Sequence, residues 1–257
     1  METVGGLLRE WRHTRRLSQL DLAITADVSA RYVSLVETGK SRPSADMVLR
    51  LAAHLDVPLR HRNRLLVAAG FAPRYRQRPL DEPDMAAVRD AVARILRAHE
   101  PYPALVVDGH WNILMHNTPV ELFFADVDPA LLTPPVNMVR LGLSPQGLAD
   151  RIVNLAEVRA LFRARLSRQA AKTGDPAVAA LYEEFFPEPE GPVPGLGSEV
   201  ATPMVFHFQG SEVRLFSTIT TFGTPQDITL DEISIESYYP ADEAGAAVLR
   251  DIAAARP

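Results

Sequence analysis

Residues 17–44 read LSQLDLAITADVSARYVSLVETGKSRPS, and this stretch decides the fold of the N-terminal part of the chain. Ser18 with Asp21 forms a capping box, in which a serine and an acid three residues later satisfy the free amides of a helix start. Ser29 is a second helix start, because it again precedes a run with apolar spacing. Two starts this close leave room for one tight turn, so the sequence predicts a helix-turn-helix.

Three positions inside this stretch have the properties that two steeply crossing helices require. Ala23 is small where the two helices must approach each other, and Val33 is an apolar plug on the second helix. Asp27 lies in the turn between the two helices. These positions favour a helix-turn-helix over two unrelated short helices.

The stretch resembles the phage-repressor-like XRE family of helix-turn-helix proteins. The resemblance continues through residues 37–44 (ETGKSRPS), which are similar to the family's acid-x-Gly-Lys-x-x-Pro-Ser signature. One departure is Asp27, since the family usually has glycine at that position. The resemblance implies a left-handed backbone there, which aspartate tolerates better than most residues. The resemblance implies that residues 30–38 form a helix that enters the major groove of double-stranded DNA.

The resemblance also implies roles for single residues. Arg31 is the candidate base reader, because its guanidinium fork matches the two acceptors on guanine. Ala30, Tyr32 and Ser34 are neighbouring candidates, although Tyr32 can equally pack beside the groove. We expect Glu37 to have a structural partner instead of a DNA contact. The candidates for phosphate contacts, which position a domain without reading the base sequence, are Gln19, Ser29, Lys40 and Arg42.

Charge is divided unevenly along the 257 residues of the chain. Residues 1–80 contain 14 Lys/Arg and 7 Asp/Glu, a net charge of +7. Residues 81–257 contain 13 Lys/Arg and 25 Asp/Glu, a net charge of −12, which gives −5 for the chain. A basic segment next to an acidic one favours a nucleic-acid-binding module joined to a domain with another kind of partner. Chance clustering of solvated charge is the alternative.

The composition excludes several classes of protein. A hydrophobic share of 47% is ordinary for a globular protein and excludes a mainly disordered chain. No apolar run reaches the ~18–20 residues of a membrane helix, and residues 1–12 lack a signal segment, so we expect a cytoplasmic protein without a membrane partner. The absence of cysteine excludes disulfides, thiolate metal ligands and thiol nucleophiles.

A proline-rich stretch divides the chain into two predicted domains. Residues 73–84 change from basic to acidic and are the expected linker. They separate a helix-turn-helix domain of residues 1–72 from a second domain of residues 85–257. The predicted fold class is α+β: an N-terminal all-α five-helix domain is followed by an α/β sensor domain with an antiparallel sheet.

The second domain mixes strand and helix patterns. Around the Asp108–Gly109 turn, residues 104–115 predict a β-hairpin. Further predicted strands are residues 199–209, 212–221 and 234–239. Helical spacing predicts helices at residues 85–99, 117–124, 151–171, 177–186 and 242–255.

Several segments of this domain resemble the ligand-binding domain of MmyB-like transcription regulators, which follows an XRE-type domain in that family. The most specific are residues 218–227 (TITTFGTPQD), 236–242 (ESYYPAD) and 249–250. The hairpin, followed by Asn117 and a short helix, resembles the opening of a PAS domain. The resemblance implies a PAS-like fold with an apolar pocket and a fatty-acid-like ligand.

A bound acyl chain needs apolar walls and a polar anchor for its carboxylate. Arg140 is the candidate anchor, with Asn117 and Asn137 as hydrogen-bond donors. The alternatives are an ordinary surface ion pair for Arg140 and a helix cap for Asn117. The candidates for the apolar lining, each of which can equally be core, are Trp111, Met115, Phe123, Phe162, Phe206 and Phe216.

The sequence therefore predicts a sequence-specific, one-component transcription regulator that binds DNA as a homodimer. Its C-terminal domain is predicted to sense a small apolar or fatty-acid-like ligand, and no cofactor is obligatory. No catalytic motif is present, and His110 and His116 lack further ligands for a metal, so we predict no catalytic residues, no metal site and no enzyme activity. Two alternatives stay open: a C-terminal domain that only dimerises or docks a protein, and an enzyme acting on a small molecule.

Overall fold

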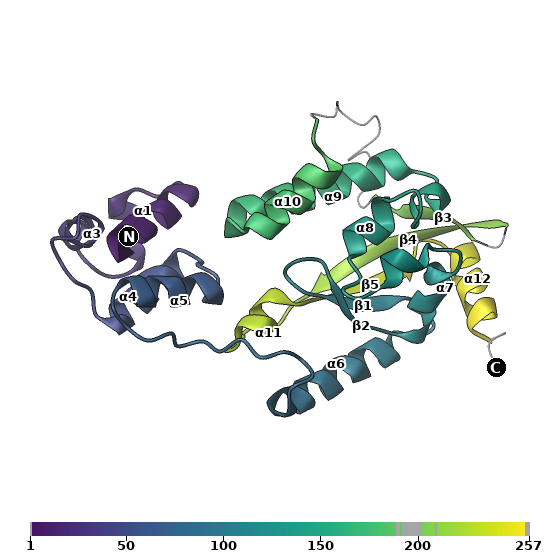
Figure 1. The fold of residues 1–257 in the computed structure, drawn as a ribbon, viewed down its shortest axis with the longest axis horizontal. Coiled ribbons are helices and arrows are strands. Elements are labelled where there is room, and N and C mark those ends of the chain that lie inside the picture. Colours follow the sequence, from purple (N-terminus) through teal and green to yellow (C-terminus); the bar gives the residue numbers. More distant parts are fainter. Residues whose placement is uncertain (1, 189–190, 192–201, 209, 255–257) are drawn as a thin grey trace. The chain divides into compact units, whose positions relative to one another are not determined.

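The computed structural model describes residues 2–188, 191, 202–208 and 210–254 (Figure 1). These residues form two compact units. The first, called the helical unit, holds the chain up to Arg78 together with Ala171–Thr173 and Thr224–Asp231. The second, called the sheet unit, holds Pro79–Ala170, Gly174–Gly223 and the chain from Glu232 onward.

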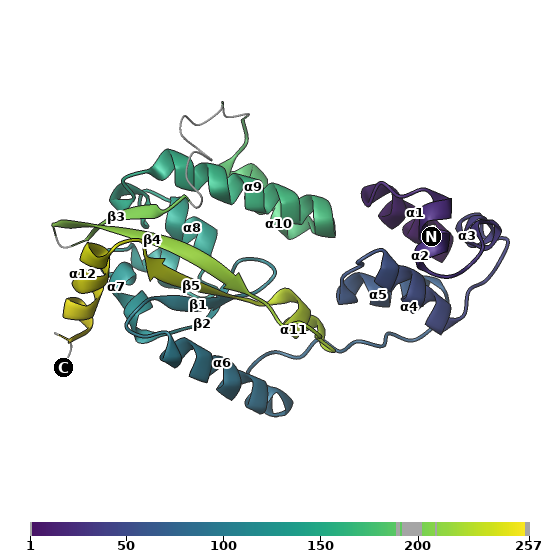
Figure 2. The ribbon, with the colours of Figure 1, turned by 180° about the vertical axis from the view of Figure 1, so that it is seen from behind.

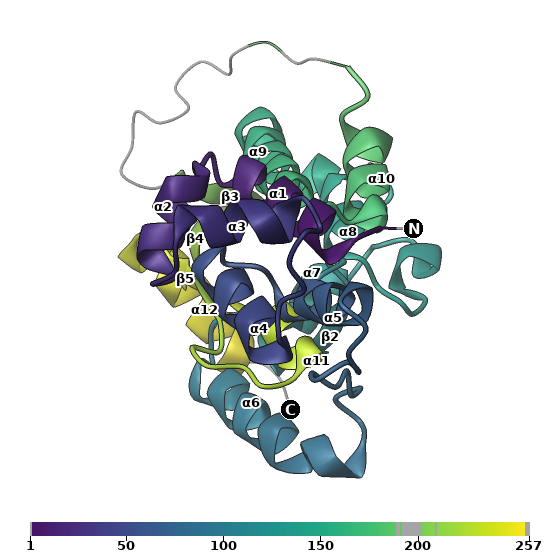
Figure 3. The same ribbon diagram turned by 90° about the vertical axis from the view of Figure 1, so that its left-hand side faces the viewer.

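The helical unit consists of short helices, two of which begin at the predicted caps (Figure 3). The Ser18 hydroxyl accepts the Asp21 amide, and the Asp21 carboxylate accepts the Ser18 amide, so the predicted capping box is present. Ser29 likewise accepts the amide of Tyr32. The helices are α1 (Val4–Thr14), α2 (Gln19–Thr25), α3 (Ala30–Glu37), α4 (Ala45–His54) and α5 (Leu59–Ala68).

The turn between α2 and α3 has the predicted conformation. Asp27 has a φ of 52°, in the left-handed region. Ala23 and Ala26 are buried, as is Val33 on α3, so the two helices cross closely. The helix-turn-helix prediction is thus confirmed, and small side chains at the crossing are its physical basis.

The sheet unit contains one antiparallel sheet of five strands in the order β2-β1-β5-β4-β3. In the register, Leu105 pairs with Glu236, Ser217 with Tyr238, and Met204 with Leu215. Residues 199–201 and 209 of one predicted strand lie outside the described residues. The strands are β1 (Ala104–Val107), β2 (Ile113–His116), β3 (Met204–Phe208), β4 (Ser211–Thr220) and β5 (Ser234–Pro240).

Helices connect and cover these strands, so the predicted α+β class is confirmed. Two of them, α8 and α11, were not predicted, because each is too short to show helical periodicity and α8 is buried on nearly all sides. The helices are α6 (Ala86–Ala98), α7 (Glu121–Phe124), α8 (Met138–Leu143), α9 (Leu155–Thr173), α10 (Pro176–Phe185), α11 (Ile228–Glu232) and α12 (Glu243–Ala254).

The two faces of the sheet have different surroundings. Helix α9 lies along one face and α6 along the other (Figures 1 and 2). Alternating side chains such as Leu105, Leu215 and Tyr238 pack into the main core on the α9 side, which also contains Phe162. On the α6 side, His99 contacts the ring of Tyr239, with a centroid distance of 4.7 Å.

Candidate DNA-binding surface and ligand pocket

Helix α3, which contains the predicted DNA contacts, is held tightly against α1. Val33 and Val36 are buried in the core of the helical unit. Gly5 of α1 lies so close to the end of α3 that an added Cβ atom would be 2.3 Å from the Val36 carbonyl oxygen. The buried face of α3 is therefore fixed, and its orientation determines which side chains face solvent.

The opposite face of α3 carries the predicted DNA contacts. Arg31 is exposed, and Ala30, Tyr32 and Ser34 are half-buried beside it. Within the part of the chain that the structure describes, Arg31 makes no hydrogen bond or ion pair. Its guanidinium is thus free to meet acceptors on a base edge, which is the contact expected of a base reader.

A buried ion pair joins the last residue of α3, Glu37, to Arg12 of α1. Arg12 donates from Nε to Glu37 Oε1 at 2.6 Å and from Nη2 to Oε2 at 2.9 Å, and Gln19 Nε2 donates to Oε2 at 2.8 Å. Burial acts to raise the pKa of Glu37, but these bonds from Arg12 and Gln19 lower it overall. Arg12 is thus the structural partner expected for Glu37. The side-chain amide of Gln19, a candidate for a phosphate contact, donates to the same carboxylate.

The other phosphate candidates have different surroundings. Lys40 is exposed, and the Ser29 hydroxyl still has its own hydrogen to donate while it caps α3. Arg42 donates from Nη2 to the carbonyl of Ala69 at 3.1 Å, so it stabilises the end of α5. Lys40 and Ser29 thus keep donors for a phosphate oxygen, whereas Arg42 is partly occupied inside the unit.

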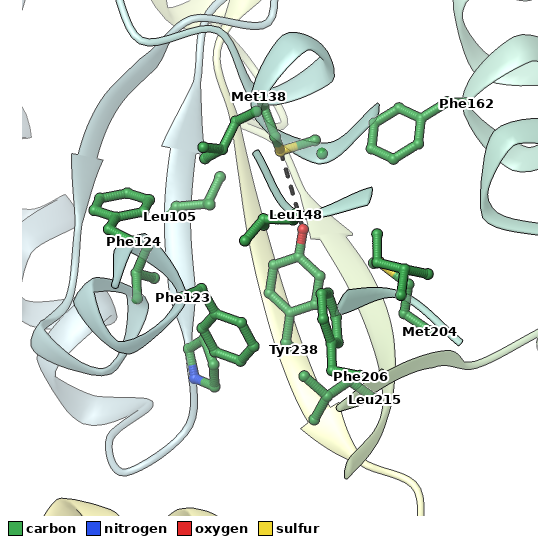
Figure 4. Close-up of a pocket in the computed structure, with 15 residues that line it drawn as sticks. Leu105, Phe123, Phe124, Met138, Leu148, Phe162, Met204, Phe206, Leu215 and Tyr238 are labelled. Atoms are coloured by element: carbon green, nitrogen blue, oxygen red, sulfur yellow. Dashed lines mark hydrogen bonds between the residues drawn. The ribbon is translucent and has the colours of Figure 1, made fainter. Parts of the chain in front are cut away.

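An apolar cavity of about 70 Å³ lies in the sheet unit between the sheet and the helices α7, α8 and α9 (Figure 4). Figure 4 shows rings and aliphatic side chains converging from several elements, with the Tyr238 hydroxyl turned toward the sulfur of Met138 at 4.0 Å. The lining residues include Leu105, Phe123, Phe124, Met138, Leu148, Phe162, Met204, Phe206, Leu215 and Tyr238.

A second cavity, of about 240 Å³, adjoins the first. Phe162, Met204 and Tyr238 line both, so these side chains form the boundary between them. Unlike the first cavity, the second is lined in part by charged groups, Arg165 and Glu236. Together the two cavities offer an apolar end and a polar end.

Arg165 of α9 is positioned by two neighbours, Glu236 and Trp111. Its Nη2 donates to Glu236 Oε1, and its Nη1 lies 3.4 Å from Glu236 Oε2. Its guanidinium carbon lies 4.4 Å from the centroid of the Trp111 ring, a cation–π contact. Trp111 is itself fixed, because its Nε1 donates to Gln169 Oε1 at 2.7 Å.

Tyr238 completes the polar end. Its hydroxyl donates to Glu236 Oε2 at 3.3 Å. Burial raises the pKa of Tyr238 well above its ordinary value, and the nearby Glu236 carboxylate adds to the rise. The phenol therefore stays neutral and serves as a hydrogen-bond donor between the two cavities.

Comparison with known families assigns a separate family to each of the two parts of the chain. Residues 3–65 match the helix-turn-helix domain family. Residues 88–252 match the family described as the MmyB-like transcription regulator ligand binding domain. The chain belongs to the family of MmyB-like transcription regulators. It is therefore a DNA-binding transcription regulator with a domain for a small-molecule ligand. A comparison with curated proteins finds no match.

The polar ligand contacts predicted for this regulator lie outside the lining of both cavities. Asn117 accepts the Ala104 amide and donates to the carbonyls of Leu96 and Tyr102, so its side chain ties the hairpin to α6. Asn137 caps α8. Arg140 Nε lies 2.9 Å from Glu184 Oε1, and this ion pair is partly exposed.

The apolar predictions are divided between the cavities and the core. Phe123 and Phe206 line the first cavity, and Phe162 lines both. Phe216 lines the second. Trp111 is buried beneath Arg165, and Met115 lies on strand β2, so neither contributes to the described lining.

The sequence analysis missed the charged side chains that line the second cavity. A signal was available, since Val158, Phe162 and Arg165 recur at helical spacing and put an arginine on the apolar face of α9. Its partner Glu236 lies 71 residues away, in a strand whose ends and pairing the sequence alone does not specify. An arginine on an otherwise apolar helix face is therefore the observable that points to such a site.

Metal-binding clusters and membrane-spanning helices are both absent from the described residues. No group of three or more His, Asp or Glu side chains in the part that the structure describes has the geometry to hold a metal ion. No helix among the described residues is long and apolar enough to span a bilayer.

Proposed function

We propose that this regulator senses an amphipathic small molecule of the fatty-acid type. The apolar chain would occupy the first cavity and the polar end would lie at Arg165 and Glu236 in the second. The observation that supports this most directly is the junction of the two cavities at Phe162, Met204 and Tyr238. A pocket with apolar walls and a few convergent polar groups is the usual form of a small-molecule site.

The size of the first cavity restricts how a ligand enters it. A cavity of about 70 Å³ is smaller than the ~150 Å³ engineered cavity that holds benzene. A ligand chain therefore needs side chains to move. Met138 and Met204 line the cavity, and methionine adapts its shape at low cost. Ligand binding would thus widen the space between α8 and the sheet.

The charges at the second cavity favour a head group with acceptor oxygens. Guanidinium has five N–H donors, and Glu236 engages Nη1 and Nη2 of Arg165. The Nε–H makes no bond to the residues that the structure describes. A carboxylate or ester oxygen can accept from it, which would fix the head group while the chain lies among the rings.

Mass spectrometry of an organic extract tests this proposal. The wild-type protein should release an acyl or similar compound in stoichiometric amount, relative to a mock purification. Gly142→Leu should release much less, because this helical glycine lines the first cavity and an added Cβ would lie 3.8 Å from the Phe162 ring, so the leucine fills the space. A wild-type extract with no bound compound would favour a C-terminal domain that only dimerises or docks a protein, and crosslinking would then identify the partner.

The second part of the proposal concerns how the protein binds its DNA operator. We propose that a homodimer, held together by PAS-like sheet units, places two copies of α3 about one DNA turn apart, or ~34 Å, on a two-fold symmetric operator. The antiparallel sheet with helices inserted between β2 and β3 supports the PAS-like assignment. Chromatography with light scattering on the full chain, with and without operator, measures the oligomeric state.

Arg31→Ala tests the assignment of the base reader. The substitution should cost about 1–3 kcal/mol at one base position and relax discrimination there, measured by competition between single-base operator variants. Lys40→Ala is the matched control, since loss of a phosphate contact should weaken all sequences alike and reduce the salt slope by about one unit. Equal weakening of specific and random DNA by Arg31→Ala would remove it from the base readers.

A further inference from the structure

The segment Thr224–Asp231 lies between β4 and β5 in the sequence but belongs to the helical unit. It overlaps the end of the motif TITTFGTPQD that marks the ligand-binding domain. Its hydrogen-bond partners are the first residue of α5 and the residues that follow this helix. A piece of the ligand-binding domain's chain is therefore part of the unit that binds DNA.

Asp227 is the centre of the first contact. The amide of Ile228 donates to the carbonyl of Arg76 at 2.8 Å, and Arg76 and Asp227 form a parallel β-bridge. The Asp227 carboxylate accepts Arg78 Nε at 2.9 Å and the Thr229 amide at 2.9 Å. With a residue exposure of 1%, Asp227 is buried, so this charged contact is shielded from solvent.

Asp231 makes the second contact, at the start of α5. The N-cap residue there is Pro58, which has no side chain able to accept a hydrogen bond. Asp231 Oδ2 instead accepts the Leu59 amide at 2.9 Å. A carboxylate at a helix N-terminus also interacts favourably with the helix dipole. The cap of α5 is thus supplied by a residue 172 positions later in the chain.

Helix α5 and the residues after it form one body with this segment. Asn63 of α5 donates to the carbonyl of Tyr75 at 2.7 Å and accepts the amides of Arg74 and Tyr75. The expected linker at residues 73–84 therefore begins with a stretch that is fixed to α5. Asn63 thus fixes residues 74–75 to α5, Asp227 joins the segment to residues 76–78, and Asp231 joins its end to Leu59.

We propose that Thr224–Asp231 transmits ligand occupancy from the sheet unit to the DNA-binding helices. The inference rests on the proposed ligand site. Strand β4 carries Ser217 and Ile219, and β5 carries Glu236 and Tyr238, all of which line the second cavity. The segment is the covalent connection between these two strands, so a change in their spacing moves its ends. Its anchors then pass that movement to α5.

Hydrogen exchange on the full chain without ligand tests the anchoring. Asp227→Asn keeps an acceptor for the Thr229 amide but removes the charge that pairs with Arg78. The amides of Leu59 and Ile228 should then exchange at least about tenfold faster, because the segment opens more often. Asp128→Asn is the matched control, since Asp128 also accepts an amide two residues later, that of Ala130, but lies outside the segment. Unchanged exchange at both amides in Asp227→Asn overturns the proposal.

Operator binding tests the transmission. Operator DNA is first selected from random duplexes by the wild-type chain, and its Kd is measured with and without dodecanoic acid. We expect the acid to change the Kd of wild type and of Asp128→Asn by about fivefold or more, and that of Asp227→Asn by less than about twofold. An equal response of wild type and Asp227→Asn overturns the transmission.

A wild-type protein that does not respond to dodecanoic acid would count against the proposed ligand class and not against the segment. Ser217→Trp then replaces the ligand, because its bulk fills the second cavity from β4. Ser217→Trp should change the operator Kd in the wild-type background but not together with Asp227→Asn. If Ser217→Trp changes the Kd in neither background, or equally in both, the segment does not transmit.

Discussion

Each unit of the molecule contains one buried glutamate paired with an arginine, and the two pairs differ in what surrounds the arginine. In the helical unit the side chains of Arg12 and Glu37 are 8% and 2% exposed. In the sheet unit those of Arg165 and Glu236 are 29% and 1% exposed. The carboxylates are similarly buried, but of these two arginines it is Arg165 that lines a cavity described above.

This difference separates a structural pair from one that is open to a ligand. Arg12 donates hydrogen bonds to Glu37 and to the carbonyl of Leu17. We call this pair closed, because these bonds engage all three nitrogens of its guanidinium. Arg165 lies between an aromatic ring and an open space. Burial of the carboxylate alone therefore does not indicate a functional site; the space around the cation does.

The largest effect is expected from breaking the closed pair. Glu37→Ala leaves Arg12 buried without its partner and should reduce the free energy of unfolding by about 3–5 kcal/mol. Urea denaturation of the full chain, followed by far-UV circular dichroism, measures it. Glu10→Ala on the exposed side of α1 is the control and should stay within about 0.5 kcal/mol of wild type. A decrease in the free energy of unfolding of less than about 1 kcal/mol for Glu37→Ala would mean that the Arg12 side chain becomes hydrated in the variant.

A smaller effect is expected for the open pair. Glu236→Ala should cost about 1–3 kcal/mol, because Arg165 can turn toward the second cavity and be hydrated there. The same denaturation experiment applies, and Glu212→Ala, at an exposed position of β4, is its control. A cost as large as that of Glu37→Ala would remove the distinction between the two pairs.

The smallest effect is expected from pH. Hydrogen bonds from Arg12 and Gln19 outweigh burial and lower the pKa of Glu37, so its ionised form stabilises the native state. This contribution is complete above the ordinary glutamate pKa of about 4.3 and is lost as the pH falls through the lower native value. The stability difference between wild type and Glu37→Gln should be constant from about pH 7 to 5 and shrink below about pH 4. A difference that does not change with pH would contradict a lowered pKa.

The sequence predicted most where the interactions are local. The caps at Ser18 and Ser29, and the turn at Asp27, depend on residues within four positions of one another, so spacing alone revealed them. The α+β class and most strands of the sheet unit followed from apolar patterns of the same kind.

The sequence predicted least where the residues in contact are far apart in the chain. Arg165 meets Glu236, and Asp231 meets Leu59, across separations that no local pattern encodes. Arg140 is a candidate anchor by charge, yet it pairs with Glu184, because residues 81–257 contain almost twice as many acids as bases and only the fold decides which acid lies near it. Cavity walls and ordinary core also use the same residue types, so periodicity does not separate them.

The cap that Asp231 supplies to α5 has a consequence for how the protein is made. The chain emerges from the ribosome N-terminus first, at about 5–20 residues per second. Helix α5 is complete long before Asp231 has been synthesised. For roughly 8–30 seconds of synthesis the nascent helical unit lacks this cap and the Asp227 contact. A newly made chain therefore gains its finished DNA-binding unit only after most of the sheet unit has been translated.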